Sequence, residues 1–348
     1  MLAPGYYLLV FIAAALIVFR TIPFVKATAL KYQYTDLPAQ RKVHQQPMVR
    51  LGGISICAGT LVALLIVWGL GGFAHFSPEV QSEVLGVILG SFCFFLIGVT
   101  DDLMGLSPIF RLLLQAGVAS VVWEIGVQIS FINLPGLGII HLGWLSLPLT
   151  VFWLTGVVNA INWIDGLDGL ASGVAAIASA IIFVLSLSIG QTETALISAA
   201  LVGSLLGFLY YNFNPAQIFM GDGGSYFIGF TIASLSVTGL VKGAVATAVF
   251  LPFLVLAVPL LDMSAVIALR LGHGKSPFQA DQRHLHHRLL KAGLSHRLTV
   301  VLIYALTLWI GSLGLVFAEV PRSLVVVCST TGVLGYMSWR AWNSAHNF

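Results

Sequence analysis

Two adjacent aspartates, Asp101 and Asp102, close an apolar stretch of the chain. On a helix they would lie at its C-terminal end, where mutual repulsion and the negative end of the helix dipole destabilise charged carboxylates. A neighbouring cation is therefore expected, and a divalent ion that prefers oxygen ligands would suit this position. The alternative is a pair of solvated residues that ends a membrane segment, and the pair alone favours neither interpretation.

A second polar group, Asn159, Asn162, Asp165 and Asp168, follows another apolar stretch. Residues three apart lie near one helix face, so the first three side chains would point from an apolar segment into a polar cleft. The two Asp-Gly pairs permit a tight turn whose N–H groups can approach a ligand. A plain turn would explain the glycines but would leave two asparagines of the apolar segment without a role.

The segment 211–225 ends as Asp222-Gly-Gly-Ser before a further apolar run. This sequence is typical of a helix start, where free N–H groups and the positive end of the dipole suit an anion. Asp222 could also ligate a metal that bridges such an anion. Taken by itself, simple capping is the stronger interpretation.

Three histidines and two arginines fall within six residues: Arg283, His284, His286, His287 and Arg288. Their side chains offer a compact set of donors for phosphate. Clustered histidines also bind zinc, but no nearby cysteine or carboxylate completes a familiar zinc spacing, although distant aspartates could. A basic loop that only sets membrane topology would need no histidines, so anion binding is favoured.

A basic loop, 36–53, contains Arg41, Lys42, His44 and Arg50. A loop of this kind beside a membrane segment usually sets topology or contacts lipid head groups. Here the lipid contact could itself be functional.

The elements that position these residues are expected to be membrane helices. Of 348 residues 58% are apolar and only 8% are charged, with a mean hydropathy of +0.97. Soluble domains carry about a quarter charged residues, so a soluble fold is excluded. The net charge of only +3 argues against a nucleic-acid partner. The three cysteines lie in apolar runs without a disulfide or ligand spacing.

A helix needs about 20 apolar residues to cross the hydrocarbon core. That length predicts a single all-α membrane domain over residues 1–348, with Pro252 and Pro259 kinking its ninth span. Basic residues follow the first apolar run and do not precede it, which favours a retained span over a signal peptide. About eleven spans are expected, at roughly 4–25, 51–70, 83–100, 109–129, 148–165, 172–190, 194–212, 225–240, 244–270, 299–318 and 322–340.

Most basic residues fall in the loops on one side of these spans, which predicts an external N-terminus and a cytoplasmic C-terminus. The candidate aspartates and histidines fall on the same side, so an active-site cleft is expected on the cytoplasmic face. The segment 130–147 is expected on the outer side, as a hairpin or a short re-entrant piece.

Taken jointly, the motifs resemble those of the bacterial polyprenyl-phosphate N-acetylhexosamine-1-phosphate transferases of glycosyltransferase family 4. The closest resemblance is to the undecaprenyl-phosphate N-acetylglucosamine-1-phosphate transferase branch, over roughly residues 30–300, and the branch that makes lipid I of peptidoglycan is more distant. The motifs that carry it are Arg41-Lys42-Val-His44 to Arg50-Leu-Gly-Gly, Asp101-Asp102, Asn159 to Gly169, Phe219-Met-Gly-Asp222 and His284-Leu-His286-His287.

This resemblance implies an Mg²⁺-dependent enzyme, with Mn²⁺ as a substitute, in which Asp222 is the principal metal ligand beside Asp101 and Asp102. The catalytic residues it implies are Asp101, Asp102, Asp165, Asp168, His284, His286 and His287. The substrate-binding residues it implies are Arg41, Lys42, His44, Arg50, Arg111, Asn159, Asn162, Asn212, Arg283 and Arg288. Arg111 departs from the usual lysine of the family and cannot serve as a lysine-type base.

The resemblance further implies a reaction at the bacterial inner membrane, with a UDP-sugar and a polyprenyl phosphate as partners. Sugar 1-phosphate, most simply N-acetylglucosamine 1-phosphate, passes to undecaprenyl phosphate, UMP leaves, and envelope polysaccharide synthesis begins. Membrane lipids are further partners, and a homodimer is compatible with the sequence. The main alternative is a cation- or proton-coupled transporter, which would place its ionisable residues near the bilayer midplane and often contain inverted repeats. A non-catalytic lipid-binding scaffold is a weaker alternative.

Overall fold

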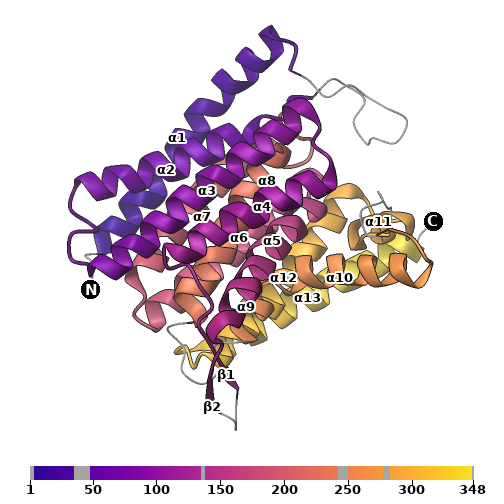
Figure 1. The fold of residues 1–348 in the computed structure, drawn as a ribbon. Coiled ribbons are helices and arrows are strands. Elements are labelled where there is room, and N and C mark those ends of the chain that lie inside the picture. The colour runs from indigo at the N-terminus through magenta and orange to yellow at the C-terminus, as the bar shows by residue number, and fades with distance from the viewer. Residues whose placement is uncertain (1–3, 35–47, 135–137, 242–249, 277–282, 347–348) are drawn as a thin grey trace.

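The computed structural model describes residues 4–34, 48–134, 138–241, 250–276 and 283–346, which form thirteen α-helices and one hairpin (Figure 1). The helices are α1 (Pro4–Lys31), α2 (Gly52–Gly69), α3 (Pro78–Met104), α4 (Pro108–Glu124), α5 (Ser146–Ile164), α6 (Leu170–Ser188), α7 (Thr192–Asn212), α8 (Gly221–Leu235), α9 (Phe250–Val255), α10 (Ala257–Gly272), α11 (Leu285–Lys291), α12 (His296–Phe317) and α13 (Ser323–His346). The antiparallel hairpin pairs β1 (Phe131–Leu134) with β2 (Gly138–His141).

Each of the eleven apolar segments expected to cross the membrane contains a helix, so the all-α architecture is confirmed. Among the described residues, seven helices are long and apolar enough to span a bilayer: α1, α2, α3, α5 with the turn before it, α6, α7 and α12. The number of crossings, their direction and the extent of the domain stay predictions. The ninth segment is divided, because α9 ends at Val255 and α10 begins at Ala257.

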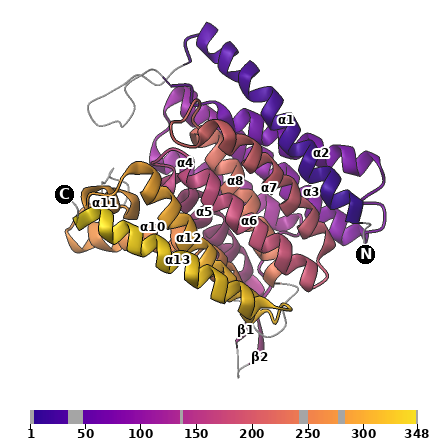
Figure 2. The same ribbon diagram turned by 180° about the vertical axis from the view of Figure 1, so that it is seen from behind.

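Helix α8 forms the centre of the bundle. It packs against α3 and α5, and every one of its residues except Asp222 is buried. A helix that is apolar all round is typical of such a core position. Helices α1 and α2 lie along one side of the bundle, and α12 and α13 lie along the other (Figures 1 and 2).

The two ends of the bundle differ in character. The β1–β2 hairpin, which confirms the hairpin expected within 130–147, projects from one end, and α11 lies at the other (Figures 1 and 2). The hairpin follows the C-terminal end of α4 and precedes the start of α5. The C-terminal ends of α3 and α5 and the starts of α2 and α8 meet away from it, and they carry the candidate aspartates.

Candidate active site

Main-chain hydrogen bonds bring the end of the first loop to the start of α8. The N–H of Phe219 donates to the Val49 carbonyl (2.8 Å), and the N–H of Gly52 donates to the Phe219 carbonyl (2.9 Å). A third bond runs from the Gly53 N–H to the Met220 carbonyl (2.8 Å). This short ladder places Arg50, which lies between Val49 and Gly52, in the polar end of the bundle.

Two close backbone contacts hold α2 and α3 against the first turn of α8. A Cβ atom added to Gly53 would overlap the backbone nitrogen of Gly224, and one added to Gly98 would overlap the carbonyl of Asp222. Only glycine leaves room for main chains this close. The aspartates of α3 and α8 are therefore positioned by contacts that tolerate little displacement.

The carboxylates of α3 and α8 share one guanidinium group. A terminal nitrogen of Arg50 lies 3.9 Å from Asp102 Oδ1 and 4.0 Å from Asp222 Oδ1. Asn162 of α5 donates to Asp222 Oδ1 at 2.7 Å, and the Gly223 N–H donates to Asp102 Oδ2 at 2.9 Å. The positive end of α8 thus stabilises the Asp102 carboxylate.

Asp165 joins this group through its charge. Desolvation raises the pKa of its carboxyl to about 7, opposed by Arg50 and reinforced by Asp222 and Asp102. We refer to Arg50, Asp102, Asn162, Asp165 and Asp222 as the carboxylate centre.

The neighbour of Asp102 in the sequence has different partners. Asp101 is buried and accepts hydrogen bonds from Arg111 (2.6 Å), from the Tyr226 hydroxyl (3.2 Å) and from the Leu106 N–H (2.8 Å). Its carboxylate is thus engaged by protein donors, and it holds Arg111 beside α8. The prediction that Asp101 is also a metal ligand stays a prediction.

The carboxylate centre has the donors that Mg²⁺ requires. Asp102 Oδ1 is buried without a hydrogen-bond partner, and Asp222 lies across the same guanidinium. The described residues contain no group of three or more His, Cys, Asp or Glu side chains arranged for a metal. Mg²⁺ commonly takes one or two carboxylates and completes its shell with phosphate and water, so Asp102 and Asp222 are a candidate pair of ligands for it.

Asn159 and Asn162, expected on one stripe, point to different neighbours. Asn162 reaches Asp222, whereas Asn159 donates to Gln115 of α4 (2.8 Å) and to the Thr155 carbonyl (2.7 Å). The structure therefore brings Asn162 into the centre and leaves Asn159 at the contact between α4 and α5. A substrate role of Asn159 stays a prediction.

Asp168 and Asn212 hold the loops around the centre. Asp168 Oδ2 accepts from the Asn214 side chain and the Ala216 N–H, both at 3.0 Å. Asn212 is buried, accepts from the Gly169 N–H (3.1 Å) and donates to the carbonyl of residue 218 (3.0 Å). These bonds fasten the turn at 165–169 to the segment 213–219.

The histidines approach the centre through the same turn. His286 is 1% exposed, and neither of its ring nitrogens has a hydrogen-bond partner. It packs directly against Gly166, the residue after Asp165. Burial, with the charges of His287 and His284, lowers the pKa of His286 to about 3, so its ring is neutral at ordinary pH.

The remaining basic residues are placed less closely. Arg288 is exposed at the last turn of α11, and Arg283 is half-buried just before that helix. Arg41, Lys42 and His44 lie outside the described residues. Their predicted contacts with substrate stay predictions.

Two residues near the site were given no role of their own from the sequence. Tyr226 lies within an apolar run, and nothing in its spacing distinguishes it as a partner of Asp101. Asp262, in α10, is bonded to His284. The sequence did point to Asp262, because an acid inside an apolar run is by default a candidate functional residue.

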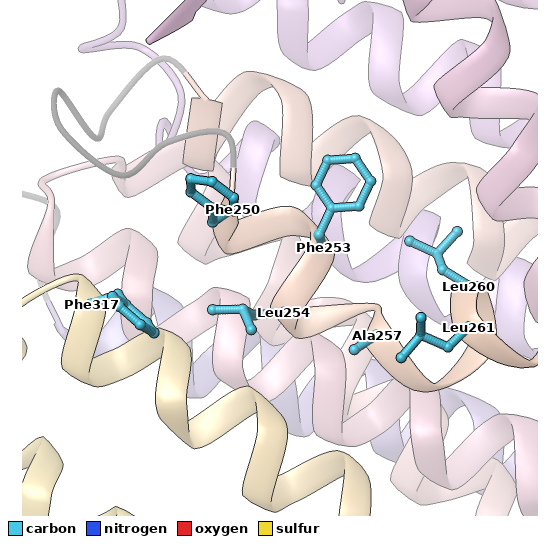
Figure 3. A pocket seen from close by; sticks show the side chains of 7 residues that line it. All are labelled: Phe250, Phe253, Leu254, Ala257, Leu260, Leu261 and Phe317. Carbon is cyan, nitrogen blue, oxygen red and sulfur yellow. The ribbon is translucent and has the colours of Figure 1, made fainter. Parts of the chain in front are cut away.

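A cavity outside the carboxylate centre is lined by apolar side chains. It has a volume of about 450 Å³ and lies between α9, α10 and α12 (Figure 3). Six of its lining residues come from α9 and α10, and Phe317 reaches it from α12 (Figure 3). We call it the apolar pocket; its lining is Phe250, Phe253, Leu254, Ala257, Leu260, Leu261 and Phe317.

The fold and the site define a multi-pass membrane protein that gathers carboxylates, an arginine and histidines at the ends of its helices. Residues 84–240 match the family model described as "Glycosyl transferase family 4". The chain belongs to this family.

Relatives from three kinds of bacteria are similar over most of their length. The chain is 40% identical to a "Probable undecaprenyl-phosphate N-acetylglucosaminyl 1-phosphate transferase" of Bacillus subtilis, covering 84% of this chain and 80% of the relative. It is 37% identical to a "Decaprenyl-phosphate N-acetylglucosaminephosphotransferase" of Mycobacterium leprae, covering 87% and 81%. It is 30% identical to an "Undecaprenyl-phosphate alpha-N-acetylglucosaminyl 1-phosphate transferase" of Escherichia coli K12, covering 92% and 88%.

Proposed function

We propose that this protein transfers N-acetylglucosamine 1-phosphate from UDP-N-acetylglucosamine to a polyprenyl phosphate, releasing UMP and initiating an envelope polysaccharide. The observation that carries the proposal is the pair of carboxylates, Asp102 and Asp222, facing one arginine at the helix ends. The names of relatives up to 40% identical to this chain point to the same reaction.

Both substrates are anionic, so the site must neutralise charge before they can approach each other. Asp102 and Asp222 would hold Mg²⁺, with Mn²⁺ as a substitute and Asp101 as a further candidate ligand. When bound, the ion neutralises the diphosphate and orients it. Arg50 is close enough to both acids to contact a phosphate bound between them.

The chemistry is an exchange of one diphosphate for another. An oxygen of the lipid phosphate attacks the β-phosphorus of the UDP-sugar and forms a new P–O bond. The bond from that phosphorus to the oxygen shared with the α-phosphate breaks, and UMP leaves with that oxygen. The acceptor needs no strong base, because a phosphate monoester with a second pKa of about 6 is mostly ionised at pH 7.

The protein's own residues orient the reactants. Asn162 holds Asp222 through a 2.7 Å hydrogen bond, and Asp101 holds Arg111 at 2.6 Å beside Tyr226 of α8. His286, neutral and buried against Gly166, can donate or accept one hydrogen bond in the donor's binding cleft without adding charge. Asp168 keeps the turn that carries Asp165 in place.

The lipid acceptor needs a place for its hydrocarbon tail. The apolar pocket suits the hydrocarbon tail of the polyprenyl phosphate, because none of its lining side chains carries a polar group. Helix α10 lines the pocket with its first residues and contacts the start of α11 through Asp262. We place the active site on the cytoplasmic face of the plasma membrane, as the distribution of basic residues predicts.

The test uses the purified protein in detergent with undecaprenyl phosphate, Mg²⁺ and a panel of UDP-sugars. UMP release should be fastest with UDP-N-acetylglucosamine, should stop on chelation by EDTA and should return when Mg²⁺ is restored. No UMP with any donor or metal would refute the proposal. Faster release with UDP-N-acetylgalactosamine would retain the reaction and change the sugar.

The transporter alternative predicts a different arrangement. Coupling residues in transporters lie near the bilayer midplane, whereas Asp102 and Asp222 lie within three residues of a helix end. Ion flux into vesicles that contain the protein, without UMP release, would favour the transporter.

A further inference from the structure

Helix α10 carries an acid that the proposed reaction does not use. Asp262 is the sixth residue of this helix, stands in an apolar sequence and is only 9% exposed. A charged group buried in such a helix is costly unless it is paired. Asp262 Oδ2 lies 2.8 Å from Nδ1 of His284, and Asp262 Oδ1 accepts the N–H of Leu285 at 2.7 Å.

These two bonds determine how the histidine segment begins. His284 occupies the N-cap position of α11, a helix of seven residues, and its own side chain makes no capping bond. Asp262 supplies the missing acceptor from another helix by binding the first free N–H. A carboxylate only accepts, so the hydrogen of the His284 ring is held on Nδ1.

Ring contacts connect this anchor to the carboxylate centre. His284 meets Trp163 of α5 edge to face, with centroids 5.9 Å apart, and Arg270 of α10 lies 4.9 Å over the same indole. The rings of His284 and His286 are stacked at 5.7 Å and 11°. His286 in turn packs against Gly166, directly after Asp165.

We propose that Asp262 is a positioning residue for the histidine segment: it keeps His284 with its hydrogen on Nδ1 and so places His286 against the Asp165 turn. This inference rests on the proposed function. Asp262 contacts no substrate, and it acts only through His284 and the start of α11.

The first experiment is a double-mutant cycle, read as kcat and KM for UDP-N-acetylglucosamine. Asp262→Asn keeps the size of the side chain but replaces one carboxylate oxygen with an NH₂ group. That group cannot accept a hydrogen bond, so either the His284 Nδ1–H or the Leu285 N–H loses its acceptor. The substitution should lower kcat/KM for the donor at least about tenfold, as expected when a carboxylate that orients a histidine is lost. The KM for polyprenyl phosphate should stay unchanged, and Asp262→Glu should recover part of the loss.

The decisive comparison adds His284→Gln. If Asp262 acts through His284, the double variant should lose no more than about twofold beyond His284→Gln alone. Losses that multiply, or Asp262→Asn kinetics equal to those of the unaltered enzyme, would overturn the proposal. Glu79→Gln, an acid at the start of α3 away from the site, serves as the matched control and should leave all constants unchanged.

A second measurement is independent of turnover and of how well Asp262 variants fold. The unaltered protein, labelled with ¹⁵N-histidine, should show one ring that carries hydrogen on Nδ1 and whose signals disappear in His284→Gln. A His284 ring without hydrogen on Nδ1 would overturn the proposal. If the unaltered enzyme released no UMP, the proposed function would fail, and this signal would still report on the Asp262–His284 pair.

Discussion

The carboxylate centre and the apolar pocket are built by different means. In the centre, α2, α3 and α8 touch through their main chains, and the aspartates stand where glycines allow that approach. The pocket is only partly enclosed and is lined by apolar side chains, at a point where α9 and α10 are separate helices. Charged reactants need precisely placed groups, whereas a hydrocarbon tail needs only apolar room. The centre should therefore be far less tolerant of substitution than the pocket.

The largest effect is expected from Asp222→Ala. This change removes a carboxylate of the proposed Mg²⁺ site and should lower UMP release by at least about a thousandfold. The protein should still be extracted as a folded species, because Asp222 is the one residue of α8 that is not buried. Near-normal turnover in a folded variant would refute the metal assignment.

Gly53→Ala tests whether the close backbone contact matters. The added Cβ would overlap the main chain of Gly224, so α2 and α8 must separate, at a cost of about 1–3 kcal/mol in unfolding free energy. We expect UMP release to fall about ten- to hundredfold and the melting temperature to drop. Gly156→Ala in α5 is the control, because its Cβ would meet nothing within 4 Å. Equal behaviour of the two variants would contradict the comparison.

Ala257→Trp tests the pocket. The indole would fill space that we assign to the acceptor tail, so KM should rise about fivefold for a long-chain polyprenyl phosphate. A rise of this size corresponds to the binding free energy lost when roughly one or two methylenes of the tail are no longer buried. A short-chain acceptor should be unaffected, as should kcat. Val325→Trp, on an exposed position of α13, is the control. An equal rise for both acceptors would argue against a tail in the pocket.

The smallest effect concerns His286 and stability. Its pKa is lowered to about 3 in the folded protein, whereas the unfolded chain titrates near 6.5. Below about pH 6.5 the unfolded state gains a proton that the folded state does not, so acidification destabilises the fold. Between pH 7 and pH 5 this contributes up to about 2 kcal/mol. His286→Gln should therefore lose less thermal stability over that range than the unaltered protein, and an equal loss would contradict the assignment.

The spans could be predicted from the sequence because crossing a bilayer demands a length of apolar residues that few other structures require. The partners of individual polar side chains could not. Asp101 and Asp102 are adjacent, yet about 100° apart around a helix, and they face Arg111 and Arg50 respectively.

The asparagines show the same limit. Positions three apart differ by about 60° around a helix, which directs Asn159 to Gln115 and Asn162 to Asp222. The motif thus predicts that these residues gather, but not which helix each one meets. That choice depends on packing between α4, α5 and α8, which local spacing does not contain.

The ladder between the first loop and α8 has a consequence for sequence variation. Its three hydrogen bonds use the N–H groups of residues 52, 53 and 219, so they do not depend on the identity of the side chains at 49 or 51. The ladder itself therefore needs only the main chain at these positions, whereas the side chain of Val49 is buried in the apolar core. Proline at any of the three donor positions would unfasten the loop, because proline has no N–H to give.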